Sequence, residues 1–155
     1  MQHIQSLCTF FRLILCLGLT IGCGLGYMDN AVAAGIMRQE PVQVHVSLGN
    51  TANELKFEPD HLTFASGQRY QMVLKNPSSQ KHYFTAKDFA DNLWTQKVQA
   101  AGVEVKGAIH ELELQPGAEA DWVFVSMKPG IYELHCSIAG HAEAGMVGQI
   151  IIEAS

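Results

Sequence analysis

The sequence predicts an antiparallel β-sandwich, and two observations carry this expectation. Segments of alternating apolar and polar residues recur between positions 41 and 152, and a period of two is typical of half-buried strands. Turn clusters rich in Gly, Pro and Asn separate these segments, and short strands at such spacing are typical of sandwiches. Since 48% of the residues are hydrophobic, one domain of ordinary size can bury a sizeable core.

The first expected strand lies at residues 41–48, where three valines and Leu48 alternate with polar residues. Residues 55–70 follow, with apolar positions interrupted by two turn signals. Further strands are expected at residues 70–75, 81–85, 107–114, 120–127, 131–134 and 146–152.

One segment changes period. Apolar side chains recur every four residues at Ala86, Ala90, Trp94 and Val98. Thr85 and Asp88 fit a capping box, and Gly102 is suited to ending a helix. We therefore expect one amphipathic α-helix at residues 86–101, inserted between strands and packed over an end or edge of a sheet.

Residues 1–34 are typical of a signal peptide. They contain a single basic residue, Arg12, no acidic residue before Asp29, an apolar run, and small residues at 31–34 that suit cleavage. We expect removal of this segment, export, and one mature domain at residues 35–155. A lipid anchor at Cys23 is the alternative, although Thr20 stands where a lipoprotein signal prefers an aliphatic residue.

Cleavage would leave Cys136 as the one cysteine of an exported domain. A lone thiol cannot form an intramolecular disulfide, and in an oxidising compartment it is protected if a metal binds it. The net charge of −5 is spread along the chain without a basic stripe, so nucleic-acid binding is not expected.

Residues 131–152 carry the strongest chemical signal. Cys136, His141 and Met146 follow one another with four residues between each pair, on a loop between two expected strands. Thiolate, imidazole and thioether are soft ligands, and two histidines, one cysteine and a weak axial methionine form a blue-copper site. The alternative is structural, with a buried cysteine, a surface histidine and a core methionine.

A second histidine must come from elsewhere in the chain. His45 falls on the polar side of its strand and His61 lies beside a turn, so both are expected to be solvated. His110 shares the parity of apolar neighbours and fits a hydrogen-bonded core or rim residue. His82, after a turn and before two aromatic residues, fits either a packed histidine or a ligand.

Residues 130–148 and 57–67 together resemble the cupredoxin family, the plastocyanin and azurin group, with a ligand loop of auracyanin-type length. The resemblance extends over about residues 42–153. It implies a Greek-key β-sandwich and one copper ion, and it places the missing histidine on an earlier strand after a turn, where His82 is the match. The implied ligands are His82, Cys136, His141 and Met146.

Two positions depart from this pattern. Plastocyanin and azurin carry Asn after the first histidine ligand, where it ties neighbouring loops, whereas this chain has Tyr83. His135 precedes Cys136, as does a second-copper ligand in copper nitrite reductases. Strand alternation points His135 away from Cys136, and one domain cannot supply that second site alone, so we expect a surface or rim residue.

The resemblance implies an exported type 1 (blue) copper protein that carries single electrons between redox protein partners and is not an enzyme. The chain is expected to be a monomer in a periplasm or thylakoid lumen, without membrane insertion once the signal is removed. One alternative is a copper-binding storage or delivery protein without electron transfer. Another is an enzyme-like copper site that uses His135 in an oligomer.

Overall fold

The computed structural model describes residues 35–155. The chain divides into two units, Met1–Arg38 and Gln39–Ser155, and the strands of the described residues all belong to the second. In the first unit, the described residues 35–38 are helical. The expected signal peptide and Cys23 lie outside the described residues. Among the residues described, no helix combines the length and apolar character needed to cross a membrane.

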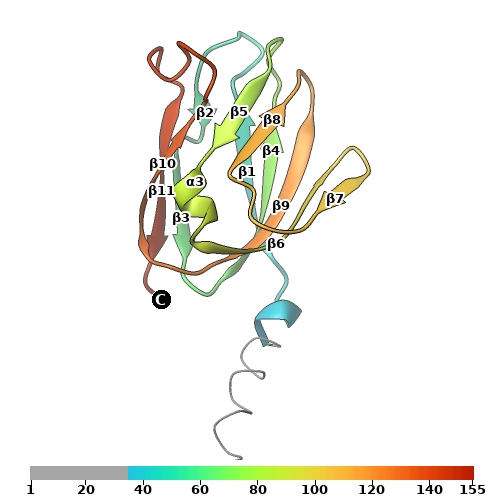
Figure 1. Ribbon diagram of the computed structural model, residues 1–155, viewed down its shortest axis with the longest axis vertical. Helices are drawn as coiled ribbons and strands as arrows, with labels where there is room; N and C mark the ends of the chain where they lie inside the picture. Colours follow the sequence, from blue (N-terminus) through green and yellow to red (C-terminus); the bar gives the residue numbers. More distant parts are fainter. Residues whose placement is uncertain (1–34) are drawn as a thin grey trace, which may run out of the picture. The chain divides into compact units, whose positions relative to one another are not determined.

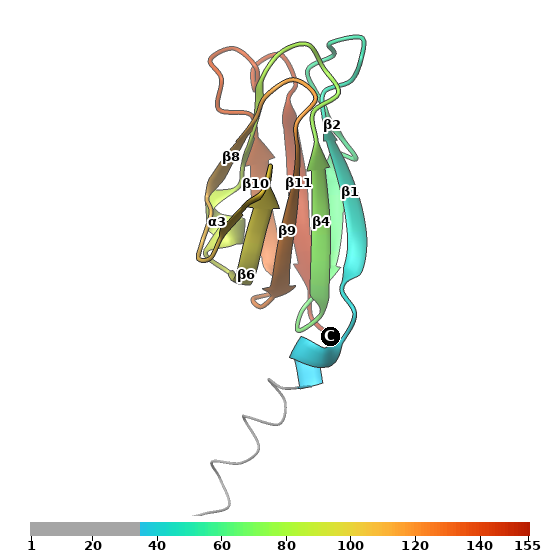
Figure 2. The same ribbon diagram turned by 90° about the vertical axis from the view of Figure 1, so that its right-hand side faces the viewer.

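Two β-sheets face each other in the second unit, which confirms the expected sandwich (Figure 1, Figure 2). The six-stranded sheet has the order β2 (Phe57–Glu58), β1 (Val42–Leu48), β4 (Arg69–Lys75), β9 (Glu119–Ser126), β6 (Leu93–Ala100) and β7 (Val103–Val105). The five-stranded sheet has the order β3 (His61–Ala65), β11 (Val147–Glu153), β10 (Gly130–His135), β5 (His82–Thr85) and β8 (Glu111–Leu114).

The sheets are not purely antiparallel as expected. β1 pairs with β4, and β3 with β11, in parallel, whereas the other neighbours are antiparallel. The parallel pairs arise because the chain changes sheets between β2 and β3 and again between β3 and β4. Alternation along one strand fixes which face is buried but not the direction of its neighbour.

The expected helix at 86–101 is confirmed only at its start. The helix α3 spans Lys87–Ala90, and residues 93–100 form β6 instead. A repeat of four residues also fits a strand, because it is a multiple of two. β6 pairs along β9 and bulges between Thr95 and Lys97, so Val98 is 4% exposed while Trp94 is 43% exposed. Pairing with β9 thus decides the structure over local periodicity.

The expected capping box at α3 is also absent. Ala86 occupies the N-cap position without a side-chain hydrogen bond, and Thr85 Oγ1 instead donates to Glu111 Oε2 over 2.9 Å. The helix is held by packing, since Phe89 and Ala90 are buried beside β10.

An aromatic cluster fills the space between the sheets. Phe64, Phe89 and Phe124 form pairs with ring centroids 5.4 to 5.6 Å apart, and Trp122 packs on both Phe89 and Phe124. Each such pair adds about 0.5–1.5 kcal/mol beyond the area it buries. This packed core fixes the ends of β5, β10 and β11, which carry the candidate metal ligands.

Candidate metal centre

The loop between β10 and β11 brings Cys136 and Met146 opposite each other. The two strands pair up to His135 and Val147, and the Cys136 N–H then donates to the Met146 carbonyl over 3.1 Å. The Met146 N–H in turn donates to the His141 carbonyl over 2.9 Å. The ladder and these two bonds close the loop, so the three donors of the sequence motif share one end of the sandwich.

Two glycines make the tight path of this loop possible. Gly140 and Gly145 directly precede His141 and Met146, and their φ angles are +86° and +106°. L side chains rarely adopt such backbone conformations, whereas glycine does so without a steric penalty.

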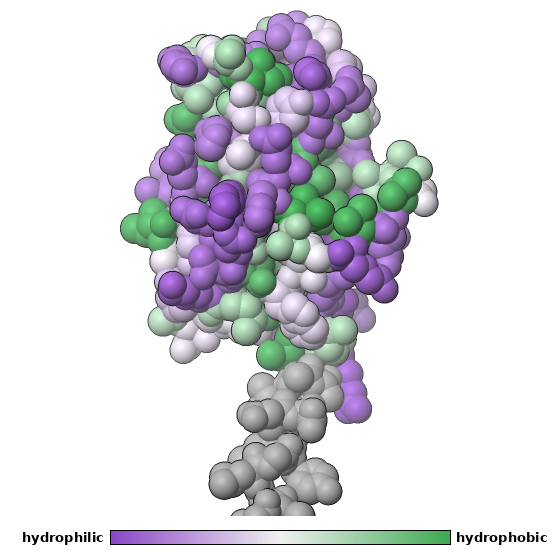
Figure 3. Space-filling view, in the orientation of Figure 1, coloured by the Kyte–Doolittle hydropathy of each residue, from purple (hydrophilic) through white to green (hydrophobic). Residues whose placement is uncertain are grey.

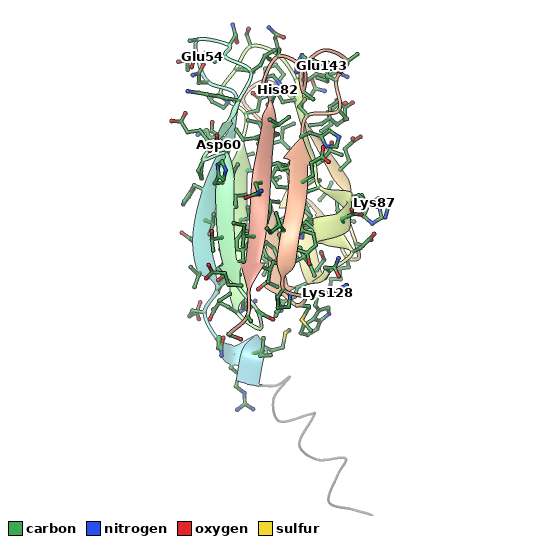
Figure 4. The ribbon with its side chains drawn as sticks, turned by 90° about the vertical axis from the view of Figure 1, so that its left-hand side faces the viewer. Glu54, Asp60, His82, Lys87, Lys128 and Glu143 are labelled. Carbon is green, nitrogen blue, oxygen red and sulfur yellow. The ribbon has the colours of Figure 1, made fainter. Side chains whose placement is uncertain are left out.

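His82 approaches the loop from the first residue of β5. Ligand atoms of His82, Cys136 and His141 all lie within 4.8 Å of one another. Cys136 Sγ lies 3.5 Å from His141 Nδ1, and the rings of the two histidines have centroids 5.3 Å apart. Figure 4 shows His82 at the same end of the sandwich as Glu143 of the loop, with Lys128 at the other end.

Burial differs among these side chains. His82 and Cys136 are each 1% exposed and Met146 is 0% exposed, whereas His141 is only partly buried. A site built from them is closed on the core side and reaches solvent through the His141 ring.

The environment of His82 suits a metal ligand. Both ring nitrogens are buried without a hydrogen-bond partner, and an unsatisfied buried polar group costs about 1–3 kcal/mol. Burial, and then the charge of nearby His141, hold the pKa of His82 below its ordinary value. An imidazole must be neutral to bind a metal, so this environment suits coordination. The residues present therefore fit a soft metal ion.

A backbone hydrogen bond holds the sulfur of Cys136. The Tyr83 N–H donates to Cys136 Sγ over 3.4 Å. This bond does not depend on the side chain at position 83, whose hydroxyl instead bonds Glu113. The departure from Asn therefore leaves the contact with sulfur intact.

The loop tie is made by Asn53 and Ser79 instead. Asn53 Oδ1 accepts from the Ser79 N–H over 2.8 Å and from the Ser79 hydroxyl over 3.0 Å. These bonds join the loop after β1 to the loop that leads into His82. A hydrogen-bonded link between these two loops is therefore present although position 83 is not Asn.

A buried polar network fixes the approach to His82. Asn76 is fully buried, and its amide donates to the carbonyls of Gln80 and Leu114 over 2.7 and 2.8 Å. Its oxygen accepts from the N–H and hydroxyl of Ser78, 3.0 and 2.8 Å away. Because the network binds the turn to β8, it sets where β5 begins.

Gly49 lies directly behind the His82 ring. A Cβ atom at position 49 would be 3.0 Å from His82 Nε2, and the φ angle of Gly49 is +74°. Sequence alone offers one signal for this position, a glycine that directly follows the first expected strand.

The remaining described histidines do not join the cluster. His45 and His61 are exposed, as expected, and His61 pairs with Asp60 over 2.9 Å. His110 is an exposed rim residue that lies 2.6 Å from Asp91. His135 is partly buried and lies 3.2 Å from Glu133 on its own strand.

Two characterised relatives share part of the sequence. The "Copper-resistant cuproprotein CopI" of Rubrivivax gelatinosus is 26% identical over 102 residues, which cover 65% of this chain and 62% of CopI. The chloroplastic plastocyanin of Silene latifolia subsp. alba is 29% identical over 121 residues, which cover 77% of this chain and 66% of that protein. The chain thus spans less than two thirds of the length of either relative.

Solved structures of similar fold include an auracyanin and a nitrite reductase. Reduced auracyanin from Roseiflexus castenholzii matches with a TM-score of 0.53 and 17% identity, covering 74% of this chain and 99% of auracyanin. The copper-containing nitrite reductase of Thermus scotoductus matches with a TM-score of 0.57 and 12% identity, covering 77% of this chain and 32% of the enzyme. At such identity these likenesses show the cupredoxin fold alone.

The family model for copper binding proteins of the plastocyanin/azurin family matches residues 44–153. This range contains every strand from β2 to β11 and the whole cluster of His82, Cys136 and His141, whose donor set fits a single type 1 copper site. The chain is a copper-binding protein and belongs to the plastocyanin/azurin family of cupredoxins.

Proposed function

We propose that the chain is an exported one-electron carrier whose copper is held by His82, Cys136, His141 and Met146. The observation that carries the proposal is the buried cluster of two histidines and one cysteine, with ligand atoms within 4.8 Å of one another. Bound copper supplies a one-electron couple, and a His₂Cys set with a weak axial methionine is suited to electron transfer.

The protein contributes rigidity to this function. The Tyr83 N–H, the Asn76 network and the closed loop at 136–146 hold the donors before any ion binds. Preorganised polar groups in a dry site need little rearrangement when the charge of the centre changes. His82 and Cys136 are each 1% exposed, so a substrate has no access to copper through them, and we propose no catalytic role.

The partly exposed His141 ring is the proposed exit for the electron. Small residues surround it on the loop, namely Ala139, Gly140, Ala142 and Ala144. Because these side chains are short, another protein can approach the ring closely. The partners we propose are therefore redox proteins that dock over this end of the sandwich.

Spectroscopy and voltammetry of the copper-loaded protein test the assignment. A thiolate-to-copper charge-transfer band with fast reversible cycling is expected, and Cys136→Ser should abolish the band. His82→Ala should also lose native-like colour, whereas the matched control His110→Ala should keep it, since His110 is exposed. Unchanged colour in His82→Ala would show that another residue completes the site.

Copper storage or delivery is the second candidate, because the relative CopI is described as a copper-resistant cuproprotein. A delivery protein must release its ion, so copper should pass readily to a competing chelator. A carrier should instead retain copper through many redox cycles. Chelator competition and repeated voltammetric cycling on one sample separate the two roles.

Export is proposed from the apolar leader and from the lone thiol of Cys136 among the described residues. Fractionation of cells that express the full chain, followed by mass measurement, tests this. We expect a mature protein outside the cytoplasm that begins near position 35. A full-length product retained in the cytoplasm would contradict the proposal.

A further inference from the structure

The strand β7 forms one end of the six-stranded sheet and pairs only with β6 among the described strands. Its two valines are unusually exposed for apolar residues, Val103 at 61% and Val105 at 43%. Figure 1 shows β7 standing out at the right-hand side of the ribbon, and Figure 3 shows apolar surface gathering at that side. An open strand edge with exposed valines is a template for pairing with another strand.

The exposed valines lie on the core side of the sheet. Val105 pairs with Val98, which is 4% exposed, and cross-strand partners point to the same face. The five-stranded sheet ends at β8 and leaves Val103 and Val105 uncovered. This apolar surface lacks the cover that the opposite sheet gives to the rest of the interior.

The backbone of β7 is arranged to accept a further strand. Ala101 and Gly102, with φ angles of +48° and +81°, form a two-residue turn that pairs Ala100 with Val103. The closing pair of such a hairpin exchanges both hydrogen bonds, and bonded pairs alternate along the ladder. The N–H and C=O of Glu104 therefore point away from β6, toward the free edge.

Charge selects the strand that fits. Glu104 and Lys106 lie two residues apart, so they share the face opposite the valines. An antiparallel copy centred on Val105 would place Glu104 opposite Lys106 of the partner subunit, and Lys106 opposite Glu104 of the partner subunit. The neighbouring register, centred on Glu104, would oppose two carboxylates and is disfavoured.

We propose that β7 is a self-association edge, at which a second copy of this chain adds antiparallel in the register centred on Val105. The two six-stranded sheets would then form one continuous sheet about a two-fold axis. Glu104 now lies 3.6 Å from Lys97 and 3.5 Å from Lys106, and such exposed ion pairs are weak enough to exchange for pairs with the partner.

The pairing leaves the copper end accessible. The loop between β10 and β11 lies at the top of Figure 1, whereas β7 lies at the side. The proposed dimer can therefore form while His141 remains open to redox partners. Because β7 has only three residues, the dimer should be weak and reversible, with a monomer at low concentration.

Sedimentation equilibrium of the protein as isolated, from roughly 10 μM to 1 mM, tests the proposal in the range expected for a small interface. We expect a monomer at the low end and a dimer at the high end. Glu104→Lys and Lys106→Glu should each weaken association about tenfold or more, since each opposes like charges twice. The matched control Ile131→Glu, at a 69% exposed residue of the other sheet, should leave association unchanged.

Mixing the two charge variants gives the decisive measurement. A Glu104→Lys chain facing a Lys106→Glu chain has opposite charges at both positions. At a concentration where each variant alone is monomeric, the mixture should therefore form a heterodimer. A monomeric wild type at 1 mM, a dimer of undiminished affinity in both single variants, or a mixture that stays monomeric would each overturn the proposal. Circular dichroism confirms that each variant is folded, and none of these outcomes depends on copper.

Discussion

Replacing Gly49 with alanine tests whether the end of β1 holds the His82 ring in place. An alanine Cβ would lie 3.0 Å from Nε2 and 3.3 Å from Cδ2 of His82. His82 is 1% exposed and packed on its other side toward His141, so the ring must shift by a few tenths of an ångström. The left-handed backbone at φ +74° adds about 1–2 kcal/mol of strain for any L side chain.

Gly117→Ala separates the two effects. Gly117 has a φ angle of +75°, and a Cβ there would meet no atom within 4 Å. This control therefore carries the backbone strain without the contact, and we expect a loss of about 1–2 kcal/mol in the free energy of unfolding with unchanged colour.

Gly49→Ala should lose about 1–3 kcal/mol more of the free energy of unfolding than Gly117→Ala, because its Cβ overpacks the site. It should also alter the visible absorption and reduction potential of the copper-loaded protein, since the shifted ring is a proposed ligand. Urea unfolding measures the first effect, and spectroscopy with voltammetry measures the second. Equal stability loss in Gly49→Ala and Gly117→Ala, with identical spectra, would refute a positioning role for Gly49.

Three further substitutions probe two contacts near the site and one ion pair at the end of α3. Asn76→Ala should lower the free energy of unfolding by about 2 kcal/mol in urea titrations, because buried carbonyls lose their donor. Tyr83→Phe should leave the visible spectrum unchanged, since the N–H on sulfur remains and only the hydroxyl contact with Glu113 is lost; an altered spectrum would assign the hydroxyl a role at the site. A hydrogen bond from Lys87 is the largest cause that holds the pKa of Asp91 below its ordinary value. The stabilisation from this ion pair is present above the ordinary pKa of an aspartate and is lost as the pH falls through the lowered pKa of Asp91. Asp91→Asn should therefore lose less stability on acidification than the wild type. An equal loss in both proteins would exclude this contribution.

Most strands of the sandwich could be predicted because alternation is a local signal. The exceptions are β6, which was expected to be helical, and β7, for which no strand was expected. Alternation in segments such as 41–48 reports a buried face whatever the neighbours are, and the structure has β1 there. The helix at 86–101 could not be separated from a strand in this way, because its repeat of four fits both periods. What distinguishes them is the partner, β9, which lies more than twenty residues further along the chain.

The ligands of the candidate site likewise differ in how far local sequence predicts them. Cys136, His141 and Met146 lie on one loop, so spacing alone brings them together. The sequence left His82 open between a packed histidine and a ligand, and family resemblance was needed to choose it. Its support comes from two other segments, the loop after β1 with Gly49 and Asn53 and the turn after β4 with Asn76.

The two histidines of the metal centre are held in different ways. His82 is held by the loop at Gly49 and Asn53, by the turn at Asn76 and by the packed core, so its position is set before an ion arrives. His141 lies on an exposed loop whose path depends on a few backbone bonds and two glycines. Substitutions around the loop should therefore affect the solvent-facing side of the site, where His141 lies. Substitutions behind His82 should change the centre itself, since Gly49 and the Asn76 network limit where the His82 ring can lie.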